Sequence, residues 1–169
     1  MNKIVPSLWF DMQCEEAMNY YVDTFNSAPH KKQESKIISI TRYEKGMEAP
    51  GAEQMVGKVI TGIFELAGQR FMALDGGLIF PFTEATSFYV ECEDQKEVDY
   101  FWKKLSAIPE SEQCGWLKDK YGLSWQIIPK QLGELMGDPD PVRSKRVINA
   151  MLKMRKIIVA DLQKAYDGK

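Results

Sequence analysis

The feature that most constrains the fold is a helix pattern that occurs twice in the chain. Apolar side chains recur at positions 0, 3, 4 and 7 of two segments, and the second segment begins 80 residues after the first, since 98 − 18 = 80. This spacing places four side chains on one face of an α-helix. The two sets are Met18, Tyr21, Val22 and Phe25, and Val98, Phe101, Trp102 and Leu105.

A short apolar run precedes each of these segments and further runs follow it, as expected for strands. The chain is therefore predicted to repeat a βαβββ module, with helices near Glu15–Asn26 and Gln95–Leu105 on the outer faces of two sheets. In the second module, the first strand after the helix is expected to be short. The predicted fold class is α+β, with paired βαβββ modules that form a curved mixed-sheet cup and with helices at the C-terminus. We expect one domain over residues 1–169, with module one at about 1–80, module two at about 81–130 and a helical extension at 131–169.

The most informative single stretch, residues 113–129, is predicted to form two short strands joined by a tight turn. Asp119 supplies a side-chain acceptor that opens such turns, and the glycine three residues later supplies a positive φ. Beyond the turn, alternation places Trp125 on one face of the strand and Gln126 on the other. Trp116 and Trp125 put aromatic area beside a few polar groups. That composition is typical of a small-molecule cleft, and equally of an ordinary core.

From Lys130 onward the apolar residues follow a helical period. Asp140 before Pro141 is typical of a helix start, because Asp caps the first turn and proline is tolerated at the first helical position. Basic side chains lie between the apolar ones. A solvated basic face is the plain interpretation, and anion binding or a dimer contact are the alternatives. These basic residues are Arg143, Lys145, Arg146, Lys153, Arg155 and Lys156.

Composition excludes several classes of function. The 169 residues are 44% hydrophobic and 27% charged, as in a soluble globular protein. A net charge of −2 gives no long-range field for nucleic acid or anionic lipid. Cys14, Cys92 and Cys114 are odd in number and widely spaced, which fits neither a disulfide framework nor a CxxC zinc site. No stretch has the pattern of a membrane span or a signal peptide, so we expect a cytoplasmic protein with no nucleic-acid or membrane partner.

Side chains for common catalytic and cofactor sites are scarce. His30 is the single histidine and falls in a loop, which argues against a nucleophile–His pair and against zinc. The glycine spacing matches no nucleotide-binding loop, and the glycine-rich loop usual for S-adenosylmethionine is missing. Two catalytic candidates remain. Asp75, on a strand face with Phe71, is a candidate general base, and Cys114 is a candidate nucleophile for which structural burial is the alternative.

Five stretches carry a further pattern: Leu8-Trp9-Phe10-Asp11; Glu16-Ala17-Met18 with Tyr20-Tyr21; Phe71-Met72-Ala73-Leu74-Asp75-Gly76-Gly77; Glu97-Val98-Asp99 with Phe101-Trp102; and Cys114-Gly115-Trp116-Leu117-Lys118-Asp119 with Gly122-Leu123-Ser124-Trp125-Gln126. Together they resemble the PhnB-like proteins, often labelled demethylubiquinone methyltransferase-like, of the glyoxalase/bleomycin-resistance/dioxygenase (vicinal oxygen chelate) superfamily. The resemblance covers nearly the whole chain. It implies paired βαβββ modules and a homodimer.

The enzymes of that superfamily hold a divalent metal with one His or Glu side chain from each of four strands. The resemblance places Pro6, Ala73, Ser87 and Gln126 at the corresponding positions. Proline and alanine have no side-chain donor atom, and serine and glutamine offer only neutral oxygens. The resemblance therefore implies a cup without a metal, and we expect no cofactor.

Three kinds of function fit these observations. The first is metal-independent binding of a small, partly aromatic molecule in the cup, as bleomycin-resistance proteins bind ligands without catalysis. The second is an enzyme, a lyase or a methyltransferase-like protein, that acts on a small substrate such as a quinone-like molecule. The third is a structural dimer whose cup is filled by its own side chains. The residues expected to face the ligand are Trp9, Phe71, Asp75, Ser87, Trp116 and Gln126.

Overall fold

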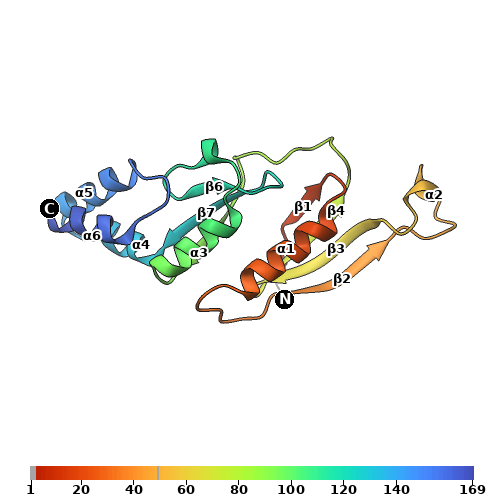
Figure 1. Ribbon diagram of the computed structural model, residues 1–169, viewed down its shortest axis with the longest axis horizontal. Coiled ribbons are helices and arrows are strands. Elements are labelled where there is room, and N and C mark those ends of the chain that lie inside the picture. Colours follow the sequence, from red (N-terminus) through yellow and green to blue (C-terminus); the bar gives the residue numbers. More distant parts are fainter. Residues whose placement is uncertain (1–2, 49) are drawn as a thin grey trace. The chain divides into compact units, whose positions relative to one another are not determined.

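The computed structural model describes residues 3–48 and 50–169. The chain divides into two compact units, Met1–Pro81 and Phe82–Lys169. Each unit has its own sheet with one principal helix, α1 in the first and α3 in the second (Figure 1). Within the described ranges, no helix is both long enough and apolar enough to cross a bilayer.

Module one has the predicted βαβββ order. Its sheet has the strand order β1-β4-β3-β2, in which β1 and β4 are parallel and the other neighbours are antiparallel. The elements are β1 (Ser7–Phe10), α1 (Cys14–Asn26), β2 (Lys36–Arg42), α2 (Ala52–Met55), β3 (Val59–Leu66) and β4 (Gln69–Asp75).

The core of module one lies between α1 and the sheet. Met18 and Tyr21, two positions of the predicted helix stripe, are fully buried. The Tyr21 ring stacks on Phe64 of β3 at 6.4 Å between centroids, and Phe64 stacks on Phe71 of β4 at 5.3 Å. Gly62 of β3 allows this close approach, since a Cβ there would lie 2.4 Å from the Met18 methyl carbon. The helix is thus fixed to the middle of the sheet.

A β-bulge interrupts the alternation of β2. Simple alternation groups Ile38 with Ile40, but the register shifts between Ile37 and Ser39. Ile37 pairs with Phe64 and Ile40 with Gly62, so both belong to the face that α1 covers. Ile38 is left out of the pairing and is 43% exposed. An inserted residue of this kind reverses the alternation beyond it.

Module two has a three-stranded sheet in the part of the chain that the structure describes, with the order β5-β7-β6. The predicted short strand after the second helix is absent from these residues. A 3₁₀-helix, η1, takes its place, and Pro109 at its start has no backbone N–H to give to a strand ladder. The module is therefore βαββ. Its elements are β5 (Ser87–Cys92), α3 (Gln95–Leu105), η1 (Pro109–Ser111), β6 (Trp116–Lys118) and β7 (Ser124–Pro129).

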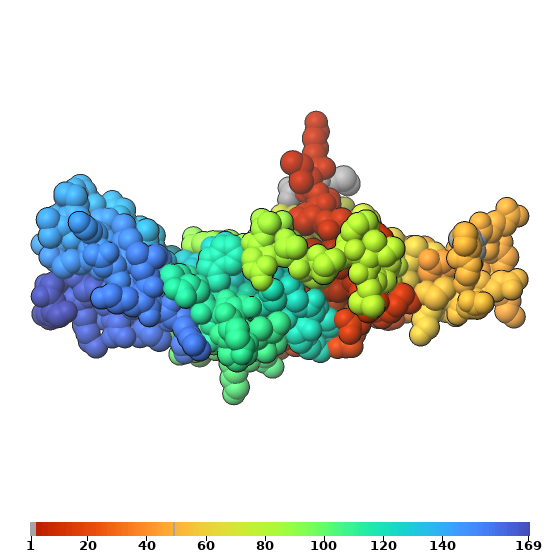
Figure 2. All heavy atoms as spheres, turned by 90° about the horizontal axis from the view of Figure 1, so that it is seen from above, coloured from red at the N-terminus to blue at the C-terminus, as the bar shows by residue number. Residues whose placement is uncertain are grey.

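The extension after β7 consists of three helices, α4 (Lys130–Met136), α5 (Pro141–Met151) and α6 (Val159–Asp167). Asp140 caps α5 as predicted, accepting a 2.8 Å hydrogen bond from the Val142 N–H. In Figure 2 the blue residues of the extension form a continuous mass against the green and teal residues of module two. The two share a core, because Ile128 of β7 is buried in one cluster with the helices. The other buried members are Leu132, Val147, Ile157 and Leu162.

Several basic side chains of the extension are engaged inside the second unit. The Arg146 guanidinium donates to the carbonyl oxygens of Ala165 and Tyr166 at the end of α6, 2.8 Å from the first. Lys156 forms an ion pair with Asp99 of α3. These contacts favour a structural role for at least part of the basic set.

Candidate functional site

The β6–β7 turn fixes the orientation of the last strand. Asp119 is fully buried, and its Oδ1 accepts hydrogen bonds from the N–H groups of Tyr121 and Leu123 at 2.9 and 3.0 Å. Its Oδ2 accepts a 2.8 Å bond from the Trp125 indole N–H. Asp119 is therefore a turn residue, as predicted. Trp125 is held in the core of module two, and Gln126 is directed to the opposite face of β7.

We call that opposite face of the β5-β7-β6 sheet the open face. In the strand register Tyr89 of β5 and Trp116 of β6 both lie beside Gln126, and Ser87 lies beside Ser124. Gln126 Nε2 donates a 2.9 Å hydrogen bond to Ser87 Oγ. The buried Ser124 Oγ has no hydrogen-bond partner among the described residues. Three of the predicted site residues, Ser87, Trp116 and Gln126, thus share one face.

A cavity of about 520 Å³ lies where the open face meets the extension. We call it the extension pocket. Cys114, Trp116 and Gln126 line it, so the structure brings one catalytic candidate and two expected ligand-binding residues together. Its lining is mainly apolar and contains no charged residue. The full lining is Tyr89, Cys114, Trp116, Gln126, Ile128, Leu132, Gly133, Met136, Gly137 and Met151.

Cys114 occupies a constrained position at the pocket wall. Its φ of 51° lies in the left-handed region, which side chains seldom adopt. Its N–H donates to the Met154 carbonyl at 2.8 Å, and the Gly115 N–H donates to the Arg155 carbonyl at 2.7 Å. The segment between α5 and α6 is thereby attached to the start of β6. Cys114 as a residue is half-buried, whereas Cys14 and Cys92 are buried.

Trp9 lies in module one, on the sheet face away from α1. Its indole N–H donates a 2.8 Å hydrogen bond to the Gly77 carbonyl, and its ring meets Phe80 edge-on at 4.9 Å. A Cβ on Gly76 would lie 1.9 Å from the indole, so only glycine permits this packing. Trp9 therefore organises the end of β4.

Phe71 and Asp75 were expected to face the ligand, but both lie on the side of the module-one sheet that α1 covers. Phe71 is 5% exposed and Ala73 is fully buried, both on the face that α1 covers. The run Phe71–Leu74 is apolar on both faces, so alternation could not decide which face is inward. Asp75 Oδ1 accepts a 2.8 Å hydrogen bond from the Cys14 N–H, at the start of α1. Gln13, the residue before α1, makes no side-chain cap hydrogen bond.

Burial governs the chemistry of this second cluster. It raises the pKa of Asp75 above its ordinary range, against the opposing effect of backbone hydrogen bonds from Cys14 and Gln13. Burial, followed by the nearby Asp75 charge, raises the pKa of Cys14 to about 12. Cys14 is therefore a thiol at neutral pH and not a thiolate nucleophile. Asp75 serves as an acceptor for the helix end.

The four positions that the resemblance relates to metal ligands are divided between the modules, with Pro6 and Ala73 in module one and Ser87 and Gln126 in module two. Ala73 lies in the core of module one, and Ser87 and Gln126 are hydrogen-bonded to each other in module two. Over residues 3–48 and 50–169, no group of three or more His, Cys, Asp or Glu side chains could hold a metal ion. The donor chemistry of these residues does not fit a tightly held transition metal.

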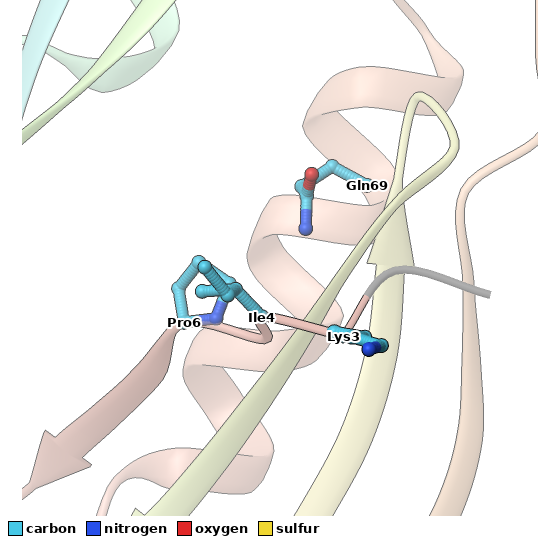
Figure 3. Close-up of a pocket in the computed structure, with 4 residues that line it drawn as sticks. All are labelled: Lys3, Ile4, Pro6 and Gln69. Carbon is cyan, nitrogen blue, oxygen red and sulfur yellow. The ribbon is translucent and has the colours of Figure 1, made fainter.

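Pro6 lines a different, shallow cavity of about 450 Å³ in module one. It lies between the N-terminal segment and the start of β4, with Gln69 on one side and Lys3 and Ile4 on the other (Figure 3). The Pro6 carbonyl accepts a 2.9 Å hydrogen bond from the Met72 N–H, which holds the segment beside the strand. None of the other predicted site residues lines this cavity.

Sequence reasoning missed most of the extension pocket. Tyr89 could have been found, because it lies two residues after Ser87 on the same strand face. The residues from α4 and α5 carry no comparable signal, since methionine and leucine at helical spacing indicate a core in the first place. They are Leu132, Gly133, Met136, Gly137 and Met151.

Comparison with known proteins gives the family. Residues 2–128 match the model of the 3-demethylubiquinone-9 3-methyltransferase family. The structure is similar to that of the PhnB protein from Bacillus cereus, with 38% identity, a TM-score of 0.59, and coverage of 76% of this chain and 99% of that one. A protein from Pseudomonas aeruginosa shares the fold at 17% identity, with a TM-score of 0.56 and coverage of 76% and 98%.

No curated protein matches the chain. The family match spans both modules and stops before α4, and the resemblance read from the sequence motifs is confirmed. The chain therefore belongs to the 3-demethylubiquinone-9 3-methyltransferase family of PhnB-like proteins.

Proposed function

We propose that the chain is a metal-independent binding protein for a small, neutral and mainly apolar molecule, and that the extension pocket is its binding site. The observation that carries this proposal is the lining of the pocket. Apolar side chains surround a few polar groups, Gln126, Tyr89 and the Cys114 thiol, and no charge is present. This is the usual composition of a small-molecule site.

Gln126 is the group best suited to orient a ligand. Its Nε2 is bonded to Ser87, which fixes the carboxamide and leaves an oxygen acceptor and a second N–H for a ligand. A hydrogen bond made here adds about 1 kcal/mol of binding free energy. A charged ligand would bury its charge without a partner and would be disfavoured.

The alternative is an enzyme, either a lyase or a methyltransferase-like protein with a quinone-like substrate. Two observations favour it: the description of the matched family, and the Cys114 thiol in the pocket wall. A methyl donor of the S-adenosylmethionine type carries an ammonium, a carboxylate and a sulfonium. The uncharged extension pocket offers none of these groups an ion partner, so its residues do not fit that donor.

A thermal-shift titration with neutral aromatic compounds tests the proposal, since a ligand of the folded state raises the melting temperature (Tm) by mass action. We expect a dose-dependent rise that is reduced in Gln126→Ala and retained in Gln163→Ala, which changes an exposed glutamine of α6. Equal rises in both variants would contradict the proposed site. Turnover of the same compound, with or without an added methyl donor, that is lost in Cys114→Ser would favour the enzyme.

We also propose that the chain forms a homodimer and acts in the cytoplasm as one glyoxalase-like domain. The dimer rests on the family resemblance, and sedimentation analysis of the purified protein tests it. The location is supported by three cysteines that are all free, as in a reducing compartment. A sedimentation coefficient that corresponds to a monomer would contradict the dimer. Export of the full-length protein from the cytoplasm would contradict the location.

A further inference from the structure

Half of the extension pocket is built by residues that lie beyond the family match. That match ends at residue 128, whereas five lining residues lie between 132 and 151. The common modules contribute Trp116 and Gln126, and the extension contributes methionines and glycines. The size and shape of the pocket therefore depend on a part of the chain that the family pattern does not include.

The extension is firmly held against module two. Besides the shared core and the Met154 and Arg155 carbonyls, Gln95 of α3 binds the segment that precedes α6. Its Nε2 donates to the Ile157 carbonyl at 3.1 Å, and its Oε1 accepts from the Val159 N–H at 2.8 Å. The extension is thus held at its start, where α4 follows β7, and again at the segment between α5 and α6. A part of the pocket that is held in this way has a defined shape, which a selective site needs.

Gly133 is the unusual residue of this wall. It lies in the interior of α4, where glycine is less favourable than alanine. Its φ is not in the left-handed region, and a Cβ built there would meet no atom within 4 Å. Neither backbone conformation nor packing therefore requires glycine. What the glycine does is leave the helix backbone uncovered toward the pocket.

We propose that the extension determines which ligand the pocket accepts, and that Gly133 is its specificity-determining position. The ligand is a neutral, flat, apolar ring with one hydroxyl or carbonyl oxygen. The uncovered backbone at Gly133 and the Trp116 indole supply flat surfaces for the ring, and Gln126 supplies a hydrogen bond for the oxygen. Met136 and Met151 adapt to its outline, since thioether side chains are flexible and polarisable. This inference rests on the proposed function.

The test uses 2-naphthol as the probe, with phenol as a smaller ring and 2-naphthoate as a charged counterpart. Binding is measured by calorimetry on the full chain. We expect 2-naphthol to bind, phenol to bind more weakly and 2-naphthoate not to bind. Gly133→Leu should stay folded, because the added side chain enters open space, and it should weaken 2-naphthol binding at least about tenfold.

Glu134→Leu is the matched control, because it adds similar bulk to the neighbouring, exposed position of the same helix. It should bind 2-naphthol as the wild type does. Gly133→Ala keeps the comparison valid if the leucine variant folds poorly. It should raise the Tm through helix propensity and weaken 2-naphthol binding more than phenol binding.

Cys114 gives a second readout, since it lines the pocket and the other two cysteines are buried. Bound 2-naphthol should slow the reaction of this thiol with a soluble disulfide reagent in the wild type, and should protect it less in Gly133→Leu. If 2-naphthol binds both proteins equally while Gln126→Ala loses binding, the pocket stands and the role of Gly133 is wrong. If neither neutral probe binds or protects the wild type, the proposed function itself is wrong.

Discussion

The carboxylate of Asp75 accepts a 2.8 Å hydrogen bond from the backbone N–H of Cys14, 61 residues earlier in the chain. The first helix is thereby capped by the strand that ends module one. Helix α1 has no side-chain cap of its own, so this contact satisfies one of the N–H groups left free at its start. The end of β4 and the start of α1 therefore depend on each other.

Substitution of Asp75 tests this dependence. Asp75→Ala removes the acceptor and is expected to lower the free energy of unfolding by about 1 kcal/mol, as for other lost helix caps. Asp75→Asn keeps an oxygen acceptor and should retain most of that contribution. Urea unfolding at pH 7 measures both variants. Asp23→Asn, on the exposed side of α1, is the control, and equal losses in both Asp75 variants would show that charge and not capping is what matters.

The pH dependence of the same residue has a definite sign. Burial raises the pKa of Asp75 in the folded chain above its ordinary value of 3.8, so the folded chain holds this proton to higher pH than the unfolded chain does. The contribution of Asp75 to the free energy of unfolding is therefore fully present below pH 3.8. It falls as the pH rises from 3.8 through the raised pKa of the folded chain. Asp75→Asn should gain stability relative to the wild type over this window. A pH-independent difference between the two proteins would refute the argument.

Substitution of Trp125 should lower the free energy of unfolding much more than substitution of its neighbour Gln126. Trp125→Ala removes a large buried ring and leaves the buried Asp119 without one of its donors, so we expect a loss of about 3–5 kcal/mol in the free energy of unfolding. Gln126→Ala should change it by less than about 1 kcal/mol. Chemical unfolding of the two variants measures this. A larger loss for Gln126 would mean that the faces of β7 are assigned the wrong way round.

Gly115 should tolerate a side chain poorly. Its φ is 86°, and a Cβ would lie 2.4 Å from Ile128 Cδ1 and 3.2 Å from the Ile127 carbonyl oxygen. Gly57 has a similar φ of 85° with open space around it. Gly57→Ala therefore measures the backbone cost alone, about 1–2 kcal/mol. Gly115→Ala should lower the free energy of unfolding by at least about 1 kcal/mol more than Gly57→Ala does, because the added Cβ clashes with Ile128 and Ile127. Thermal unfolding measures both variants. Equal losses would show that the structure around Gly115 shifts to accept the Cβ.

Purified protein is expected to hold no stoichiometric zinc, nickel, manganese or iron. His30 is the single histidine, and the four positions implied by the superfamily provide at most neutral oxygens. Elemental analysis after dialysis against chelator, followed by melting curves with added metal, tests this. One equivalent of tightly bound metal, or a metal-dependent rise in Tm that Gln126→Ala abolishes, would contradict this expectation.

The repeated helix pattern was sufficient to predict helices α1 and α3, because burial of one helix face is a local property of the sequence. Met18 and Val98, the first residues of the two stripes, are both fully buried. The turn at Asp119 was predictable for the same reason, since the bonds that its carboxylate accepts come from residues at most six positions away.

The errors arose where a contact is distant in sequence or where both strand faces are apolar. The cap on α1 comes from Asp75, and the bulge at Ile38 depends on how β2 pairs with β3, so neither could be found by inspecting its own segment. The orientation of Phe71 was also mispredicted for this reason, because it depends on packing against Phe64 and α1, which are distant in sequence. The extension pocket required three helices to pack on a sheet, which no spacing of residues along the chain specifies.

The attachment of the extension has a consequence for how the chain can be shortened. A chain that ended at Ile128, where the family match stops, would lack the helices that bury Ile128, which is 5% exposed in the full chain. It would also lack the Met154 and Arg155 carbonyls that accept hydrogen bonds from the Cys114 and Gly115 N–H groups. Apolar surface and an unpaired strand end would then meet water together, which is the condition under which sheets associate. Such a fragment is expected to aggregate on expression, and stable folding of module two is then expected to require residues beyond the family match.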